Sequence, residues 1–176
     1  MKRVFLIFVA MGMMLSATVA QVSVWDGTHT AWTNGAGTQS NPYLIETAQH
    51  LAYLAVYVNN GTEAVDDVVG SGKYWKLTTN INLNSLEWNP IGHYYYSGGN
   101  HYSFGGHFDG DGYTVTNLIV SDALYAGLFG HMCGGSVKNV GIIGNSSISS
   151  NSDYQNCAGG IVGAGNHISI SSDALN

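Results

Sequence analysis

The segment DGDG, Asp109 to Gly112, contains two carboxylates two residues apart. Oxygen atoms of Asp109 and Asp111 could coordinate calcium, but a loop of the EF-hand type needs further oxygen ligands and a distal glutamate, which do not follow here. The same residues favour a tight turn, because Asp-Gly readily adopts positive φ. We therefore interpret DGDG as a turn before the next strand, with calcium binding as the alternative.

Seven histidines raise the question of a zinc site or a general base. Four of them, spaced 8, 6 and 24 residues apart, match no zinc pattern; these are His93, His101, His107 and His131. The chain contains no H-E-x-x-H pair, and polysaccharide cleavage would require paired carboxylates or a cation beside a uronate. We expect no catalytic residue, no metal and no cofactor.

A glycine-rich segment with four tyrosines is the best candidate for ligand binding. Exposed aromatic rings among neutral polar neighbours can stack on sugar rings or contact a protein. Alternatively, the rings pack over the base of their own loop or under the N-terminal helix. The four residues are Tyr94, Tyr95, Tyr96 and Tyr102.

The N-terminal residues predict export. Lys2 and Arg3 precede the apolar run VFLIFVAMGMML, and small residues follow, so we interpret residues 1–20 as a signal peptide cleaved after Ala20. No second apolar run follows, and we expect a secreted or cell-surface protein without membrane insertion of the mature chain. Its three lysines against eleven carboxylates give a formal charge of −8. This balance excludes nucleic acid and anionic lipid as natural partners.

Two cysteines, Cys133 and Cys157, lie 24 residues apart. An exported protein meets an oxidising environment, in which the two could form one disulfide. Two buried free thiols are the alternative, because the sequence does not give the distance between them.

One helix is predicted over residues 48–59. Apolar residues recur there at helical spacing, Thr47 is a suitable N-cap, and Asn60-Gly61 favours the left-handed conformation that ends a helix. The recurring residues are Leu51, Leu54, Ala55 and Val58. A single apolar stripe implies that the helix covers another element, and we expect it to cover the open end of a β structure.

The residues from Lys73 onward alternate with a period of two, which predicts strands with one buried face. In KYWKLTTNINLN the inward set is Trp75, Leu77, Thr79, Ile81 and Leu83. Further strands are expected in GGHFDGDGYTVTNLIV, AGLFGHMCGGSVKNVGII and AGGIVGAGNHISI.

The last three of these segments are internal repeats. Matching Phe108 to Phe129 gives a step of 21 residues, whereas Phe129 to Val162 gives 33, which we explain by a polar loop that protrudes from one coil. A near-constant period of this kind predicts a solenoid, in which small glycines let adjacent backbone layers approach.

The chain from about Trp25 to Gly165 resembles bacterial exported proteins that carry GLUG motifs. The segments YLIETAQHLAYLAVYVNNG, YWKLTTNINLN, WNPIG, FGGHFDGDGYTVTNLIV and AGLFG follow one another in the order typical of that family. The first motif consists of Gly127, Leu128, Phe129 and Gly130. The second departs from the pattern and consists of Gly160, Ile161, Val162 and Gly163.

This resemblance implies a right-handed parallel β-helix begun by a helix-containing cap. We expect residues 21–72 to form the cap and residues 73–176 to form coils, the last of them uncapped and open to self-association. The family includes adhesin-like proteins and the non-catalytic regions of immunoglobulin A peptidases. We therefore expect a non-catalytic surface module that binds host protein or glycan, with a carbohydrate-active β-helix enzyme as the alternative.

Overall fold

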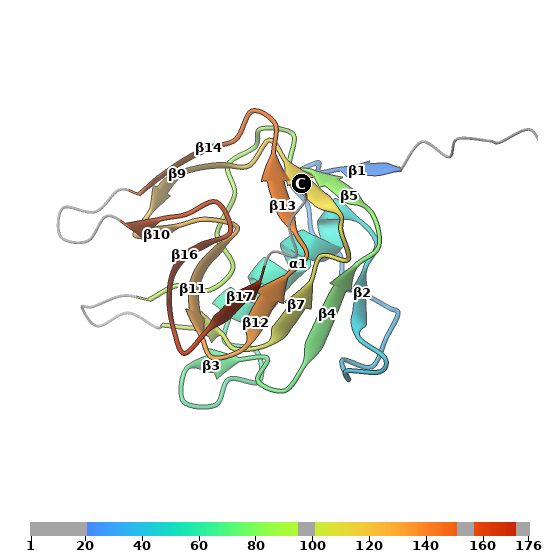
Figure 1. Ribbon diagram of the computed structural model, residues 1–176, viewed down its shortest axis with the longest axis vertical. Coiled ribbons are helices and arrows are strands. Elements are labelled where there is room, and N and C mark those ends of the chain that lie inside the picture. The colour runs from blue at the N-terminus through green and yellow to red at the C-terminus, as the bar shows by residue number, and fades with distance from the viewer. Residues whose placement is uncertain (1–20, 95–100, 151–156, 172–176) are drawn as a thin grey trace, which may run out of the picture.

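The computed structural model describes residues 21–94, 101–150 and 157–171, and this part of the chain is mainly β with one helix. The predicted signal segment, residues 1–20, lies outside the described residues. The strands are short, and they pair in parallel within the sheets. Successive passes of the chain form a β-solenoid of about three turns (Figure 1). The predicted solenoid is therefore confirmed.

The solenoid has three larger sheets and two strand pairs. One larger sheet has the order β17-β12-β7-β4-β2, with β2 (Tyr43–Ile45), β4 (Tyr74–Leu77), β7 (His107–Asp109), β12 (Ser136–Lys138) and β17 (Ser169–Ser171). The second contains β1 (Val22–Val24), β5 (Asn80–Asn82), β8 (Thr114–Thr116) and β13 (Gly141–Ile143). The third contains β3 (Val68–Val69), β6 (Ser103–Phe104), β11 (Phe129–Cys133) and β16 (Val162–Asn166). The pairs are β9 (Ile119–Ala123) with β14 (Ser147–Ser150), and β10 (Tyr125–Ala126) with β15 (Cys157–Ala158).

One coil runs from β7 through β8, β9, β10 and β11, and returns to the five-stranded sheet as β12 (Figure 1). Residues with positive φ lie at its corners: Asp111 at +51°, Asn117 at +56° and Gly135 at +70°. Asp, Asn and Gly tolerate this left-handed conformation better than other residues. The composition rich in Gly, Asn and Asp thus allows the chain to change direction between short strands.

The core consists of apolar side chains stacked in register between coils. Trp75 on β4 is paired with Phe108 on β7, which is paired with Val137 on β12, and all three are buried. Phe129 on β11 meets Phe108 edge to face, with ring centroids 5.3 Å apart. Such aromatic contacts add to the free energy gained by burying apolar area.

The structure corrects the repeat length inferred from Phe108 and Phe129. Phe108 is paired with Val137, 29 residues further on, and with Trp75, 33 residues earlier, so these distances define the coil. The 21-residue step joins two faces of one coil, whose aromatic residues meet in the core. The 33-residue step from Phe129 to Val162 is confirmed as a true coil-to-coil pairing.

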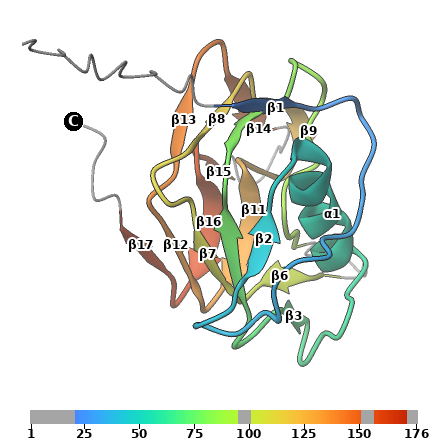
Figure 2. The ribbon, with the colours of Figure 1, turned by 90° about the vertical axis from the view of Figure 1, so that its right-hand side faces the viewer.

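Helix α1 (Ala48–Asn59) begins and ends as predicted. The Thr47 hydroxyl accepts a hydrogen bond from the His50 backbone N–H at 3.1 Å, and Gly61 follows the helix with φ of +66°. The helix packs against β2 and β6, on one side of the sheets (Figure 2). Residues 21–72 also provide β1, β2 and β3, each at the edge of its sheet.

The Gly-Leu-Phe-Gly segment joins β10 to β11 and lies beside its counterpart in the next coil. The N–H of Leu128 donates to the carbonyl oxygen of Gly160 at 3.2 Å, and the N–H of Phe129 donates to that of Ile161 at 2.9 Å. A Cβ atom on Gly127 would lie 2.6 Å from the Gly159 oxygen. The glycine is therefore required for the close approach of two backbone layers.

Candidate functional site

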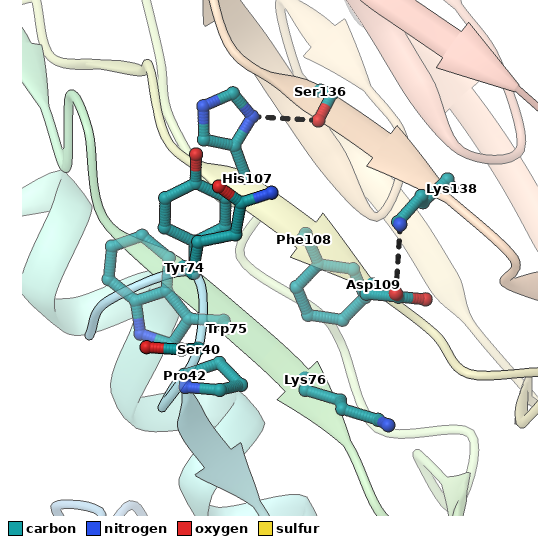
Figure 3. A pocket seen from close by; sticks show the side chains of 11 residues that line it. Ser40, Pro42, Tyr74, Trp75, Lys76, His107, Phe108, Asp109, Ser136 and Lys138 are labelled. Carbon is teal, nitrogen blue, oxygen red and sulfur yellow. Dashed lines mark hydrogen bonds and ion pairs between the residues drawn. The ribbon is translucent and has the colours of Figure 1, made fainter. Parts of the chain in front are cut away.

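An open groove of about 550 Å³ lies on the outer face of the five-stranded sheet (Figure 3). This volume is within the range of ligand-binding clefts. Its floor is formed by side chains of three neighbouring strands, β4, β7 and β12, and the segment before β2 contributes Ser40 and Pro42. The six outward residues are Tyr74, Lys76, His107, Asp109, Ser136 and Lys138.

The alternation of the strands determines which residues face the groove. Trp75, Phe108 and Val137 are buried in the core, so the residues before and after each of them point outward. Because the three strands are in register, the outward residues form two rows across the sheet. Tyr74, His107 and Ser136 form the first row, which we call the ring row. Lys76, Asp109 and Lys138 form the second, the charge row.

The ring row combines stacking with a hydrogen bond. The rings of Tyr74 and His107 are stacked, with centroids 4.4 Å apart and planes inclined by 24°. On the next strand, Ser136 Oγ lies 2.9 Å from His107 Nδ1. These contacts hold an aromatic and polar surface in a defined position across three strands.

The charge row has its carboxylate between two ammonium groups (Figure 3). Lys138 Nζ lies 3.1 Å from Asp109 Oδ2, and Lys76 Nζ lies 2.9 Å from Asp111 Oδ2 in the adjoining turn. Asp109 Oδ1 also accepts hydrogen bonds from the Asp111 backbone N–H and from Asn139 Nδ2, at 2.9 and 3.0 Å. Two lysines and two aspartates therefore give the groove no net charge.

The hydrogen bonds of Asp109 determine its protonation. Partial burial raises the pKa of the carboxyl group, but the bonds from Asp111 and Asn139 and the neighbouring Lys138 outweigh it, so the pKa lies below its ordinary value. The hydrogen bond to Asp111 raises the pKa of Lys76. The row is consequently ionised at neutral pH.

The predicted turn at DGDG is confirmed, with φ of +51° at Asp111 and +83° at Gly112. In place of a calcium ion, the two aspartates have lysine partners. Among the described residues, no group of three or more His, Cys, Asp or Glu side chains is arranged to hold a metal ion. The geometry therefore gives no support to the calcium alternative.

The tyrosine segment lies away from this groove. Tyr94 is half-buried, with its ring centroid 5.2 Å from that of His131 and 4.8 Å from that of His101. Tyr102 pairs with the backbone of His93, and its ring lies against Gly61 at the end of α1. For these two residues the packing alternative describes the contacts. Tyr95 and Tyr96 lie outside the described residues.

A second serine–histidine pair is buried under Tyr94. Ser103 Oγ lies 2.7 Å from His131 Nδ1, and the two residues are 5% and 8% exposed. Burial lowers the pKa of His131, so that the imidazole is neutral at pH 7. Such a pair could activate the hydroxyl as a nucleophile, but the cavity beside Tyr94 and Tyr125 measures only about 60 Å³. Its size does not admit a sugar or a peptide.

Both cysteines are free. Cys133 lies on β11 and Cys157 on β15, in different sheets, so the disulfide alternative is wrong for this structure. The thiols are half-buried rather than fully buried.

Sequence reasoning missed the groove because it used the wrong repeat length. The signal is present in the sequence: Lys76, Asp109 and Lys138 each follow one of the inward residues of the core row. Aligning those apolar residues with steps of 33 and 29 would have brought the three charges together.

The described part of the chain contains no helix that is long and apolar enough to cross a membrane.

Comparison with known proteins gives one relative. The chain is 34% identical over 128 residues to a protein of Evansella cellulosilytica described as "Putative Gly-rich membrane protein". The match covers 70% of this chain and 13% of the relative, so the chain spans a small part of that protein's length. No family model matches the chain. No solved structure matches it either.

Proposed function

We propose that this protein is a non-catalytic, exported surface module that binds a glycan through the groove of the five-stranded sheet. In this proposal residues 1–20 direct export, the solenoid is a right-handed β-helix, and α1 with the strands of residues 21–72 forms its N-terminal cap. Resemblance to GLUG-motif proteins places it among adhesin-like surface proteins. The word membrane in the description of the longer relative is in keeping with a surface location.

The observation that carries the proposal is the groove itself. It combines an open volume of about 550 Å³ with two in-register rows of aromatic, hydroxyl and charged side chains. Two of the three lysines that follow Ala20 lie in it, although charged residues make up only 9% of the chain. Aromatic rings beside fixed hydrogen-bonding groups are suited to sugars, which have both apolar faces and hydroxyl groups.

The protonation of the groove favours binding over the alternative of a carbohydrate-active enzyme. Glycoside hydrolysis needs a carboxylic acid whose pKa is raised, so that it can protonate the leaving oxygen. Asp109 has a lowered pKa, and Asp111 forms an ion pair with Lys76. Neither aspartate is suited to be the proton donor.

Glycan-array binding, followed by incubation with each retained polysaccharide, tests this proposal on the exported full chain. We expect retention without release of shorter sugars. The variant Lys138→Met should weaken retention, whereas Lys73→Met should not, because Lys73 pairs with Glu63 outside the groove. Turnover of any retained polysaccharide, or equal binding by the two variants, would contradict the proposal.

A further inference from the structure

Deepening the proposed function, on which this inference rests, we propose that the groove takes an uncharged polysaccharide whose neighbouring hydroxyl groups bind along the charge row. The specific ligand class is a neutral sugar chain lying across β4, β7 and β12. Asp109 is the fixed hydrogen-bond acceptor that it meets.

The charge balance of the groove argues against an anionic sugar. Each lysine head group already lies about 3 Å from a carboxylate, at 3.1 Å for Lys138 and 2.9 Å for Lys76. A uronate or sulfate would have to separate such a pair and approach Asp109 while doing so. The chain also carries a formal charge of −6, which repels polyanions at a distance.

A cationic sugar is disfavoured for the reverse reason. Its ammonium group would compete with Lys138 for Asp109 and would leave the displaced lysine beside it. A hydroxyl group faces no such conflict, because it donates one hydrogen bond and accepts others. It can donate to a carboxylate and accept from an ammonium group without separating the two charges.

The positions of the rows match a chain of sugar rings. Neighbouring strands lie about 4.8 Å apart, so Lys76, Asp109 and Lys138 extend over about 10 Å in a direction perpendicular to the strands. That length accommodates about two pyranose rings. Pro42 and Tyr74, which lie together on one side of the groove, offer apolar carbon atoms to the C–H face of a ring (Figure 3).

The residues of the charge row differ in how firmly they are held. Asp109 has a 27% exposed side chain and is fixed by Asn139, Lys138 and the backbone of Asp111. The lysine side chains are more exposed, at 36% and 49%, and can adjust their head groups to different hydroxyl positions. We therefore assign specificity to Asp109 and adaptability to the two lysines.

The experiment is affinity electrophoresis of the full chain in gels that contain a neutral polysaccharide (xyloglucan, mannan or dextran), an acidic one (alginate or polygalacturonate) or chitosan. We expect retardation by at least one neutral polymer, little changed between low and high salt, and none by the charged polymers at high salt. Asp109→Asn should reduce the neutral affinity about tenfold, because it removes the charged acceptor. The same variant gives the groove a net positive charge and should bind the acidic polymers more tightly.

The outcomes separate this inference from the proposed function. Salt-sensitive binding of alginate by the unchanged chain, lost in Lys76→Met and Lys138→Met, would overturn the uncharged ligand but leave glycan binding intact. Retention of a neutral polymer that is unaffected by Asp109→Asn would overturn the role of Asp109 alone. Retention of no polysaccharide by a folded chain would overturn both. Should Asp109→Asn not fold, Lys76→Met asks the same question from the exposed side of the row, with Lys73→Met as its charge-matched control.

Discussion

Two outer faces of this solenoid carry the same pair of side chains in different surroundings. On the five-stranded sheet, His107 bonds to Ser136 at 2.9 Å in an open groove. On the sheet β16-β11-β6-β3, His131 bonds to Ser103 at 2.7 Å under the ring of Tyr94. In both cases the partners lie on adjacent strands. The cover above the strands, rather than the pair itself, decides whether a ligand can reach them.

The difference shows how a repeating scaffold acquires a site. Parallel in-register strands bring outward residues of successive coils into rows on every face. The chain between β5 and β6 returns across one face with Tyr94, and there the row becomes an extension of the core. Only the short segment with Ser40 and Pro42 borders the other face, where the row stays available for binding.

The largest expected effect comes from removing the buried histidine. His131→Ala should lower the free energy of unfolding by about 2–4 kcal/mol, because it leaves a cavity between Tyr94 and Tyr125 and deprives the Ser103 hydroxyl of its partner. His107→Ala, on the open face, should cost within about 1 kcal/mol. Urea unfolding of both variants measures the difference. Equal losses would mean that the two faces are not distinguished by burial.

A smaller effect is expected from pH. Burial places the folded-state pKa of His131 below the value of about 6.5 for an exposed histidine, so the unfolded chain takes up the proton first as the pH falls. Stability from this group is complete above pH 6.5 and is lost between that value and the folded pKa, by at most about 1.4 kcal/mol per pH unit. Urea midpoints at pH 7.5 and 5.5 should show the loss. His131→Gln should remove this part of the slope, and a slope that persists unchanged would assign it to other groups.

The smallest effect concerns the charge row. Lys138→Met breaks a half-exposed ion pair with Asp109, and such pairs contribute about 0–1 kcal/mol. We expect a change in unfolding free energy of that size, while glycan retention falls clearly. This contrast would identify the row as a binding feature. A loss of several kcal/mol would instead show that the groove is part of the stabilising core.

Local features of the fold could be predicted from the sequence. Thr47 as the N-cap, Asn60-Gly61 as the end of the helix, and the alternation that buries Trp75 and Ile81 all depend on neighbouring residues, and the structure confirms them. The coil length could not be predicted in the same way. Phe108 and Phe129 look equivalent because both are core aromatics followed by a turn, although they come from different faces of one coil.

The candidate site was missed for the same reason. A row such as Lys76, Asp109 and Lys138 exists only once the register between coils is known, and no local pattern fixes that register. The tyrosine segment attracted attention because its rings are adjacent in sequence. Burial of Tyr94 against His131 depends on how the chain returns across the sheet, which composition does not reveal.

The parallel register also makes the groove extensible. A coil added in the same register would place one more outward residue in each row and lengthen the groove by about 4.8 Å. The length of polymer that such a surface recognises would then be measured by the number of coils, and its affinity would rise by repetition of weak contacts rather than by a stronger single site. Duplication of about 30 residues would be enough to change the preferred chain length of the ligand without altering any existing contact.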